Sequence, residues 1–158
     1  MKKHLKKKSV ISYNVIEQFI QYLKLQQEEF SGLNITIYGG EPLLSLKRIL
    51  YLHKKVSELN KNITYFVITN GYLLSLNVYK ILMELPVKHF QVTIDGFKET
   101  HNKNRPHKRN NDSFEQIIKN LDDIYAFCIA NTKKSNISIR VNIDKLNFNK
   151  FIDFYDYK

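Results

Sequence analysis

The sequence has very little cysteine: 158 residues contain one, Cys128. A single thiol excludes a disulfide within the chain, which agrees with a reducing compartment such as the cytoplasm. It also excludes a zinc or iron–sulfur site built from cysteines of these residues alone, because such sites need several thiolates. Cys128 lies in the apolar run 126–129, so we expect a buried structural thiol and not a nucleophile.

Long apolar runs are absent as well. The sequence has no stretch of about 18 apolar residues, the length that a membrane-spanning helix needs. Residues 1–8 hold five lysines and resemble the basic start of a signal peptide, but Asn14, Glu17 and Gln18 interrupt the stretch that follows. The sequence therefore predicts a cytoplasmic protein that is not exported and has no membrane partner.

The composition predicts a folded protein with a basic surface. With 158 residues, 43% of them hydrophobic, the chain fits one globular domain over residues 1–158, and no linker-like segment divides it. Its formal net charge is +10, which favours anionic partners such as nucleic acid, phosphates or acidic peptides. A lysine-rich solvated surface explains the same excess, and both interpretations stay open.

Helical and strand patterns alternate along the chain. Apolar residues recur at helical spacing in segments near 15–23, 46–56, 74–85, 113–125 and from 151 onward. Short apolar strands separate these helices at 35–38, 63–69, 90–94 and 136–143. Such alternation predicts an α/β fold with a parallel sheet and right-handed crossovers.

The last two predicted strands carry apolar residues on one face and polar residues on the other. In the fourth, Ile137 and Ile139 oppose Ser138 and Arg140. A sheet with helices on both faces would be apolar on both. We therefore predict a partial, TIM-like (β/α)₆ barrel that is incomplete, with about four parallel strands, helices on the outer face and a polar concavity inside.

Polar or glycine-rich residues follow every predicted strand. In βα folds, ligands bind at the carboxyl ends of the strands, which meet at one edge of the sheet. Four such ends in register predict a binding site there. They are Gly39-Gly40-Glu41, Thr69-Asn70-Gly71, Thr93-Ile94-Asp95-Gly96 and Asn142-Ile143-Asp144.

The first of these ends, within Ile37–Pro42, suits a small ligand with an amine. Gly39 and Gly40 have no Cβ, so the backbone can come close to a ligand. Glu41 offers acceptor oxygens for an ammonium group. Pro42 begins the next helix, where its missing N–H costs nothing. An ordinary strand-to-helix turn would explain the same residues.

A basic loop is expected at 97–111, and loops of this length in βα units are often functional. Arg105 is its strongest candidate, because a fork of donors suits carboxylate or ribose oxygens. A zinc site made by Asp95, His101 and His107 is an alternative that we disfavour. The other basic side chains are expected to be solvated.

The helix after this loop has two overlapping start signals. Ser113 with Gln116, or Asp112 with Glu115, matches the spacing of a capping box. Either pair predicts that the helix begins at about residue 113.

Five motifs, in order along the chain, resemble those of the radical S-adenosylmethionine (radical SAM) superfamily. The resemblance is strongest to the branch of anaerobic sulfatase-maturating enzymes and peptide-modifying maturases, and it spans about Val10 to Asp144. The motifs are I-Y-G-G-E-P, V-I-T-N-G, V-T-I-D-G followed by H-N-K-N-R-P, then S-F-E-Q-I-I-K-N-L and I-R-V-N-I-D.

The resemblance implies a cofactor site and a partial (β/α)₆ barrel. Gly39 to Pro42 match the loop that receives the methionyl ammonium of S-adenosyl-L-methionine. Thr93 matches a position, usually serine, that contacts this cofactor, and Arg105 matches an arginine that reaches its carboxylate or ribose. The remaining polar strand-end residues that we assign to the cofactor surface are Asn70, Asp95 and Asn142.

The chain departs from this family in one respect that matters for chemistry. The family holds a 4Fe–4S cluster with a Cys-x3-Cys-x2-Cys loop after its first strand, and that loop is absent here. The resemblance thus implies a core that lacks its first strand, cluster loop and C-terminal part. We expect it to be inactive alone, with a peptide or protein substrate and with cluster cysteines that a complementing polypeptide could supply.

A second hypothesis is a non-catalytic basic module that binds a cofactor, an acidic peptide or nucleic acid. Nucleic acid is the least favoured of these, because the sequence has no interleaved platform of aromatic residues. In either case the strand that ends at Tyr38 is expected to leave an open sheet edge, which favours association between chains.

Overall fold

The computed structural model describes residues 10–106, 112–145 and 147–156. Its chain clusters into two compact units. The smaller contains residues 1–33 and 45–63, and the larger contains residues 34–44 and 64–158. The division runs through the first two strands, so every predicted cofactor residue belongs to the larger unit.

The smaller unit is built on two helices that pack together, α1 (Tyr13–Leu25) and α2 (Leu46–Ser57). Helix α1 begins after Ser12, whose Oγ accepts a hydrogen bond from the Val15 N–H at 3.2 Å. Its buried stripe is Ile16, Ile20 and Leu23. Val15 and Phe19 are further apolar residues of the predicted helical segment 15–23, and they are exposed because they lie at the margins of this stripe.

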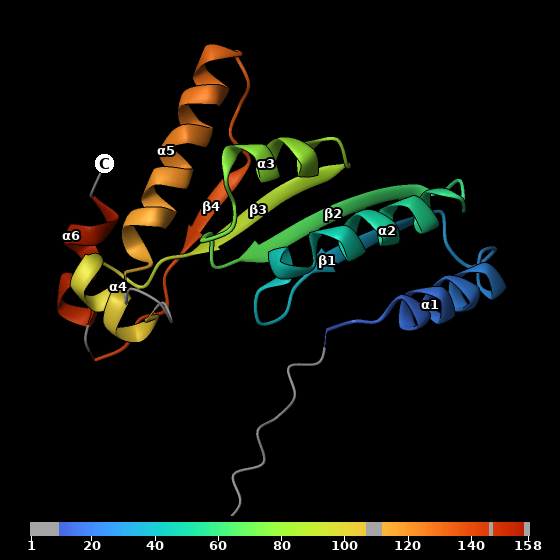
Figure 1. Ribbon diagram of the computed structural model, residues 1–158, viewed down its shortest axis with the longest axis horizontal. Coiled ribbons are helices and arrows are strands. Elements are labelled where there is room, and N and C mark those ends of the chain that lie inside the picture. Colours follow the sequence, from blue (N-terminus) through green and yellow to red (C-terminus); the bar gives the residue numbers. More distant parts are fainter. Residues whose placement is uncertain (1–9, 107–111, 146, 157–158) are drawn as a thin grey trace, which may run out of the picture. The chain divides into compact units, whose positions relative to one another are not determined.

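The sheet is open and has the strand order β1-β2-β3-β4, with parallel strands. This confirms the predicted α/β class. The strands are β1 (Gly32–Ile37), β2 (Asn62–Thr69), β3 (Val87–Thr93) and β4 (Ile137–Arg140). Thr69 pairs with Val92, and Thr93 pairs with Arg140. The carboxyl ends of β2, β3 and β4 therefore lie side by side (Figure 1).

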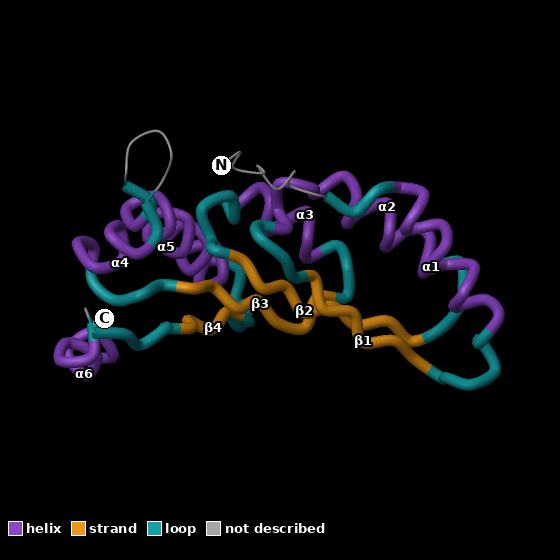
Figure 2. The backbone as a smooth tube through the Cα atoms, turned by 90° about the horizontal axis from the view of Figure 1, so that it is seen from below, coloured by secondary structure: helices purple, strands orange, loops and turns teal. Residues whose placement is uncertain are grey.

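Helices α3 (Leu76–Met83) and α5 (Phe114–Ala130) lie on the same side of the β2–β3–β4 part of the sheet (Figure 2). They cover its apolar face. The core there includes Tyr65, Val67, Phe90, Val92, Leu74, Tyr79, Leu82, Ile117, Ile124 and Cys128. Cys128 is 2% exposed, which confirms the prediction of a buried thiol. The Tyr79 hydroxyl lies 3.8 Å from its sulfur, and burial raises the pKa of Tyr79 to about 12.

Two local predictions were wrong. The fourth strand is shorter than the predicted 136–143, and Ile139 and Ile143 are 46% and 52% exposed, so its apolar face is not a core face. The reason is its place at the edge of the sheet, where it has one neighbouring strand.

The predicted loop 97–111 contains a helix, α4 (Lys98–Asn104). The His101 N–H donates to the Phe97 carbonyl at its start, and the Arg105 N–H donates to the His101 carbonyl at its end.

The remaining elements are short. They are two turns of 3-10 helix, η1 (Pro42–Ser45) and η2 (Phe148–Lys150), and the helix α6 (Phe151–Tyr155). Within the described ranges, no helix combines the length and the apolar character that crossing a membrane requires.

Candidate functional site

The loop after β1 presents bare backbone to the surroundings. Gly39 and Gly40 are exposed, and a Cβ built on either would meet no atom within 4 Å. Gly39 also has a φ of +154°, a backbone conformation that residues with a side chain rarely adopt. Neither glycine is needed for packing inside the described part of the chain. The open space beside them is available to a ligand.

Glu41 ties this loop to the end of β2. Its Oε1 accepts hydrogen bonds from the Thr69 hydroxyl at 2.8 Å and the Leu43 N–H at 3.0 Å. Its Oε2 accepts one from the Asn70 N–H at 2.9 Å. A carboxylate offers about four acceptor positions, and donors from the described residues fill three of them, which leaves one on Oε2. Glu41 thus connects the ends of β1 and β2 through its hydrogen bonds, a role that could not be predicted from its place in the motif.

The end of β2 is a tight turn that needs its glycine. The Thr69 hydroxyl accepts from the Gly71 N–H at 3.1 Å, and the Asn70 side-chain oxygen accepts from the Tyr72 N–H at 3.0 Å. Asn120 of α5, buried, donates to the Gly71 and Tyr72 carbonyls, both at 3.0 Å. Asn70 therefore lies at the predicted edge, while Asn120 was not predicted because nothing local marks an asparagine in a helix as buried.

Asp95 forms hydrogen bonds with two other predicted residues near the ends of β3 and β4. It is 4% exposed, and its Oδ2 accepts from Arg105 Nε at 2.6 Å. Its Oδ1 accepts from the Asn142 N–H at 3.2 Å and from Asn142 Nδ2 at 3.0 Å. The structure thus brings together three of the residues predicted from sequence, Asp95, Arg105 and Asn142. The Asp95 carboxylate is engaged by its own chain, so it orients Arg105.

Two further side chains support this cluster and were not predicted to do so. Asn147, 3% exposed, donates from Nδ2 to the Asp95 carbonyl at 3.1 Å and to the Asn142 carbonyl at 2.7 Å. His101 is fully buried, and its Nδ1 accepts from the Asp95 N–H at 3.1 Å.

The start of α5 is capped by a residue of α4, because the Asn102 side-chain oxygen accepts from the Ser113 and Phe114 N–H groups, both at 3.0 Å.

The predicted capping box is therefore wrong for its first pair. Ser113 is the N-cap residue, but its side chain accepts no capping hydrogen bond from the helix. The Asp112 carboxylate instead accepts from the Glu115 N–H at 3.4 Å. Asn102 supplies the main cap, which frees the Ser113 hydroxyl for other contacts.

Thr93 lies on β3 between the two clusters. It is 8% exposed. In the sheet, Val92 of β3 pairs with Thr69 of β2, and Thr93 pairs with Arg140 of β4. The Glu41 cluster and the Asp95 cluster therefore occupy the ends of adjacent strands, with Thr93 at the centre of the edge. This places the predicted cofactor residues along one edge of the sheet in the larger unit.

The residues do not fit a metal centre. Among the residues that the structure describes, no three His, Cys, Asp or Glu side chains come together as a metal site would require. Of the disfavoured zinc ligands, His107 lies outside the described residues, and both ring nitrogens of His101 contact protein atoms. Cys128 is buried against Tyr79 and stands alone in the sequence, so the three thiolates of a 4Fe–4S cluster are not here.

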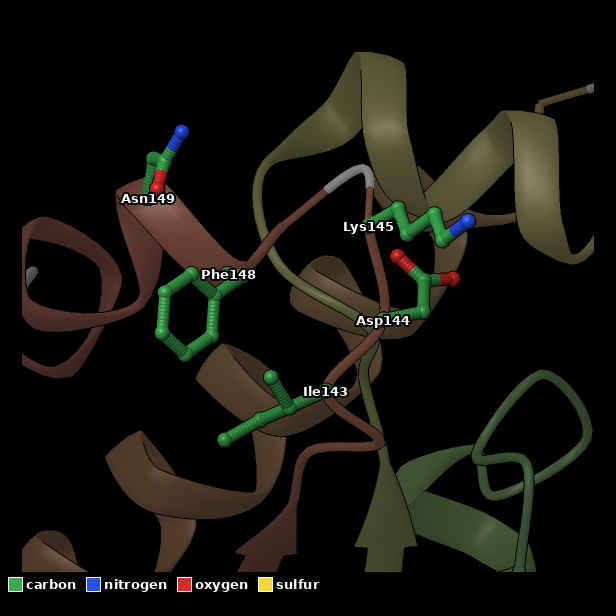
Figure 3. A pocket seen from close by; sticks show the side chains of 5 residues that line it. All are labelled: Ile143, Asp144, Lys145, Phe148 and Asn149. Carbon is green, nitrogen blue, oxygen red and sulfur yellow. The ribbon is translucent and has the colours of Figure 1, made fainter.

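A shallow hollow lies beyond β4, next to η2 (Figure 3). It is lined by Ile143, Asp144, Lys145, Phe148 and Asn149. None of the predicted cofactor residues lines it. Asp144 accepts a hydrogen bond from Asn104 Nδ2 at 2.7 Å, which fixes this turn to the end of α4.

Comparisons with known proteins agree with the sequence motifs. The family model described as "Radical SAM superfamily" matches residues 4–157. Among solved structures, native anSMEcpe with bound AdoMet and Cp18Cys peptide is similar with a TM-score of 0.78 at 22% identity, covering 94% of this chain and 40% of that one. Native anSMEcpe with bound AdoMet has a TM-score of 0.78 at 21% identity, covering 99% and 42%. The chain thus spans well under half the length of these proteins, and the likeness establishes the fold. No curated protein matches the chain.

Proposed function

Because the chain belongs to the radical SAM superfamily, we propose that it binds S-adenosylmethionine along the carboxyl edge of β1 to β4. The observation that carries the proposal is the bare backbone at Gly39 and Gly40, which stands open beside Glu41. Glycines without an internal packing role, at the end of a strand, are what a closely approached ligand requires. The ends of the next strands add Thr93 and Arg105.

Each residue has a distinct role in this proposal. Gly39 to Pro42 receive the methionyl ammonium, and the unused acceptor position of Glu41 Oε2 gives that charge a partner. Arg105 reaches the carboxylate or ribose with the terminal nitrogens of its guanidinium, while its Nε is held by Asp95. Thr93 and Asn70 complete the edge, and Asn142 keeps Asp95 in place.

Bound S-adenosylmethionine would supply a sulfonium as the source of a radical, and in this family a 4Fe–4S cluster delivers the electron. The 158 residues do not fit that cluster, since they contain one cysteine. We propose that the cluster cysteines lie outside these residues, for example on a complementing polypeptide, and that the chain by itself binds the cofactor without cleaving it.

The natural substrate class in this proposal is a peptide or protein. Support comes from the fold that the chain shares with anSMEcpe, which has been solved with the Cp18Cys and Kp18Cys peptides. In the same proposal, residues 1–158 act as one domain in the cytoplasm. The second candidate, a basic module for acidic peptides, is favoured by the net charge of +10 and predicts binding that weakens steeply with salt.

The variant Gly40→Ala tests the cofactor site without disturbing the fold. The new methyl group meets no protein atom within 4 Å, and it projects into the space that the ligand would occupy. We expect S-adenosylmethionine to bind about tenfold more weakly, a loss of about 1.4 kcal/mol. Isothermal titration calorimetry on the full chain, with S-adenosylhomocysteine as a second ligand, measures it.

Lys119→Ala is the matched control, because Lys119 is an exposed residue on α5 that pairs with Asp123 in the same helix. It should bind like the wild-type chain. Equal affinities for Gly40→Ala and wild type would refute the placement of the ligand at this loop. No binding by the wild-type chain, together with salt-sensitive binding of an acidic peptide, would favour the basic module instead.

A further inference from the structure

His101 connects the end of β3 to the start of α5 through both of its ring nitrogens. Its Nδ1 lies 3.1 Å from the backbone nitrogen of Asp95, and its Nε2 lies 3.1 Å from Ser113 Oγ. The Ser113 hydroxyl donates to the Arg105 carbonyl at 2.8 Å. Arg105 Nε in turn donates to Asp95 Oδ2 at 2.6 Å. The four residues form a closed ring of hydrogen bonds, and three of them are buried.

The ring determines which nitrogen of His101 carries the proton. A backbone N–H can only donate, so Nδ1 must accept from Asp95 and bear no proton. The single hydroxyl proton of Ser113 points to the Arg105 carbonyl, because its other acceptor, Asn102 Oδ1, is farther away at 3.4 Å. Ser113 Oγ must then accept from Nε2. His101 is therefore neutral, with its proton on Nε2.

We propose that His101 is a positioning residue for Arg105, and that the ring it completes determines how well this arginine holds the anionic or hydroxyl-bearing part of a ligand. The inference rests on the proposed function, since Arg105 is the residue expected to reach the cofactor. Arg105 is the C-cap residue that follows α4 and has non-helical backbone angles, φ −132° and ψ 62°, so the helix alone does not fix its direction. The ring fixes its carbonyl through Ser113 and its guanidinium through Asp95.

The charges around His101 agree with a neutral ring. Burial lowers the pKa of His101 from its ordinary 6.5. Asp95 and Asp112 act in the opposite direction, and the Arg105 guanidinium lowers the pKa further. From α5, the ring of Phe114 contacts the imidazole edge-on at 5.8 Å between centroids. Acid would place a second proton on Nδ1, facing the Asp95 N–H, and this would open the ring of hydrogen bonds.

Two nuclear magnetic resonance measurements on the full chain test the ring without any ligand. The ¹⁵N shifts of His101 should report a neutral imidazole protonated at Nε2 at pH 7. The Arg105 Nε–Hε signal should be visible and exchange slowly, because its proton is held by Asp95. In Ser113→Ala this signal should weaken or shift, and Ser113→Thr, which keeps the hydroxyl, should restore it. A proton on Nδ1, or an unchanged Arg105 signal in Ser113→Ala, would overturn the proposal.

Cofactor titration then tests the consequence. We expect Ser113→Ala to bind S-adenosylmethionine about fivefold more weakly, as the loss of one net hydrogen bond implies, and Ser113→Thr to bind normally. Wild-type affinity should fall in acid, at a pH below the ordinary 6.5 of histidine because burial lowers the pKa of His101, whereas His101→Asn, which cannot take up this proton, should not show that fall. If the wild-type chain binds no cofactor, the proposed function is contradicted. The resonance measurements would still show whether the ring of hydrogen bonds exists. Normal affinity in Ser113→Ala with a disturbed Arg105 signal contradicts the positioning role.

Discussion

We expect Gly71→Ala to lower the free energy of unfolding by about 3 kcal/mol, the sum of backbone strain and overpacking. Gly71 has a φ of +78°, a conformation that costs energy for any residue with a Cβ. That Cβ would lie 2.7 Å from Val92 Cγ1 and 3.1 Å from Ile117 Cγ2. Both neighbours belong to the core between the sheet and α5, where movement is costly. Urea denaturation followed by circular dichroism measures the loss.

Gly40→Ala is the control for this prediction, because it makes the same chemical change where no atom is near. Its unfolding free energy should stay equal or rise by about 0.4–1 kcal/mol, since alanine restricts the unfolded chain. Equal urea midpoints for the two variants would contradict our account of the β2 turn. The pair also separates the two uses of glycine here, one for packing and one for access by a ligand.

The architecture could be predicted from periodicity because most elements bury one clear face. The helical stripe of α5 and the apolar strand β3 both carry that signal, and their order along the chain implies a parallel sheet. What periodicity could not indicate is the number of neighbours a strand has. The pattern of β4 looks half-buried in sequence, yet Ile139 is 46% exposed because the strand lies at a sheet edge.

Helix α4 shows a second limit. Its sequence, K-E-T-H-N-K-N, has no apolar residue and no amphipathic pattern, so it was predicted as loop. The helix depends on a tertiary contact instead, since His101 is fully buried and bonded at both nitrogens. A lone histidine among polar residues gives no sign of this in a single sequence.

The candidate site was partly predictable for a related reason. Residues at strand ends, such as Asp95 and Asn142, are placed by topology, and their meeting follows from the order of the strands. Arg105 could be named from the resemblance, but its partner could not. The supporting residues Asn120 and Asn147 were missed, and Ser113 was predicted only as a helix cap, because amides and hydroxyls are common on surfaces. Only burial and hydrogen-bond geometry distinguish them.

Asp95→Asn is expected to lower the free energy of unfolding by about 2–3 kcal/mol, because it leaves buried donors without an acceptor. Asp95 Oδ2 accepts from Arg105 Nε, and Oδ1 accepts from the Asn142 N–H. An asparagine has one oxygen, so in either orientation its amide N–H₂ faces a group that can only donate. The Arg105 side chain is 35% exposed, and solvent screening keeps the loss below that of a fully buried ion pair.

Asp123→Asn is the matched control, since the Asp123 carboxylate pairs with Lys119 at 2.7 Å on an exposed helix face. Its loss should be below about 0.5 kcal/mol. A second variant, Asp95→Ala, separates the two causes: it removes the opposing amide but leaves Arg105 and Asn142 unpaired, so it should be at least as unstable as Asp95→Asn if the lost acceptors dominate. Stabilities of Asp95→Asn and Asp123→Asn within about 0.5 kcal/mol of each other would show that water satisfies the donors and that Asp95 does not hold the strand ends together.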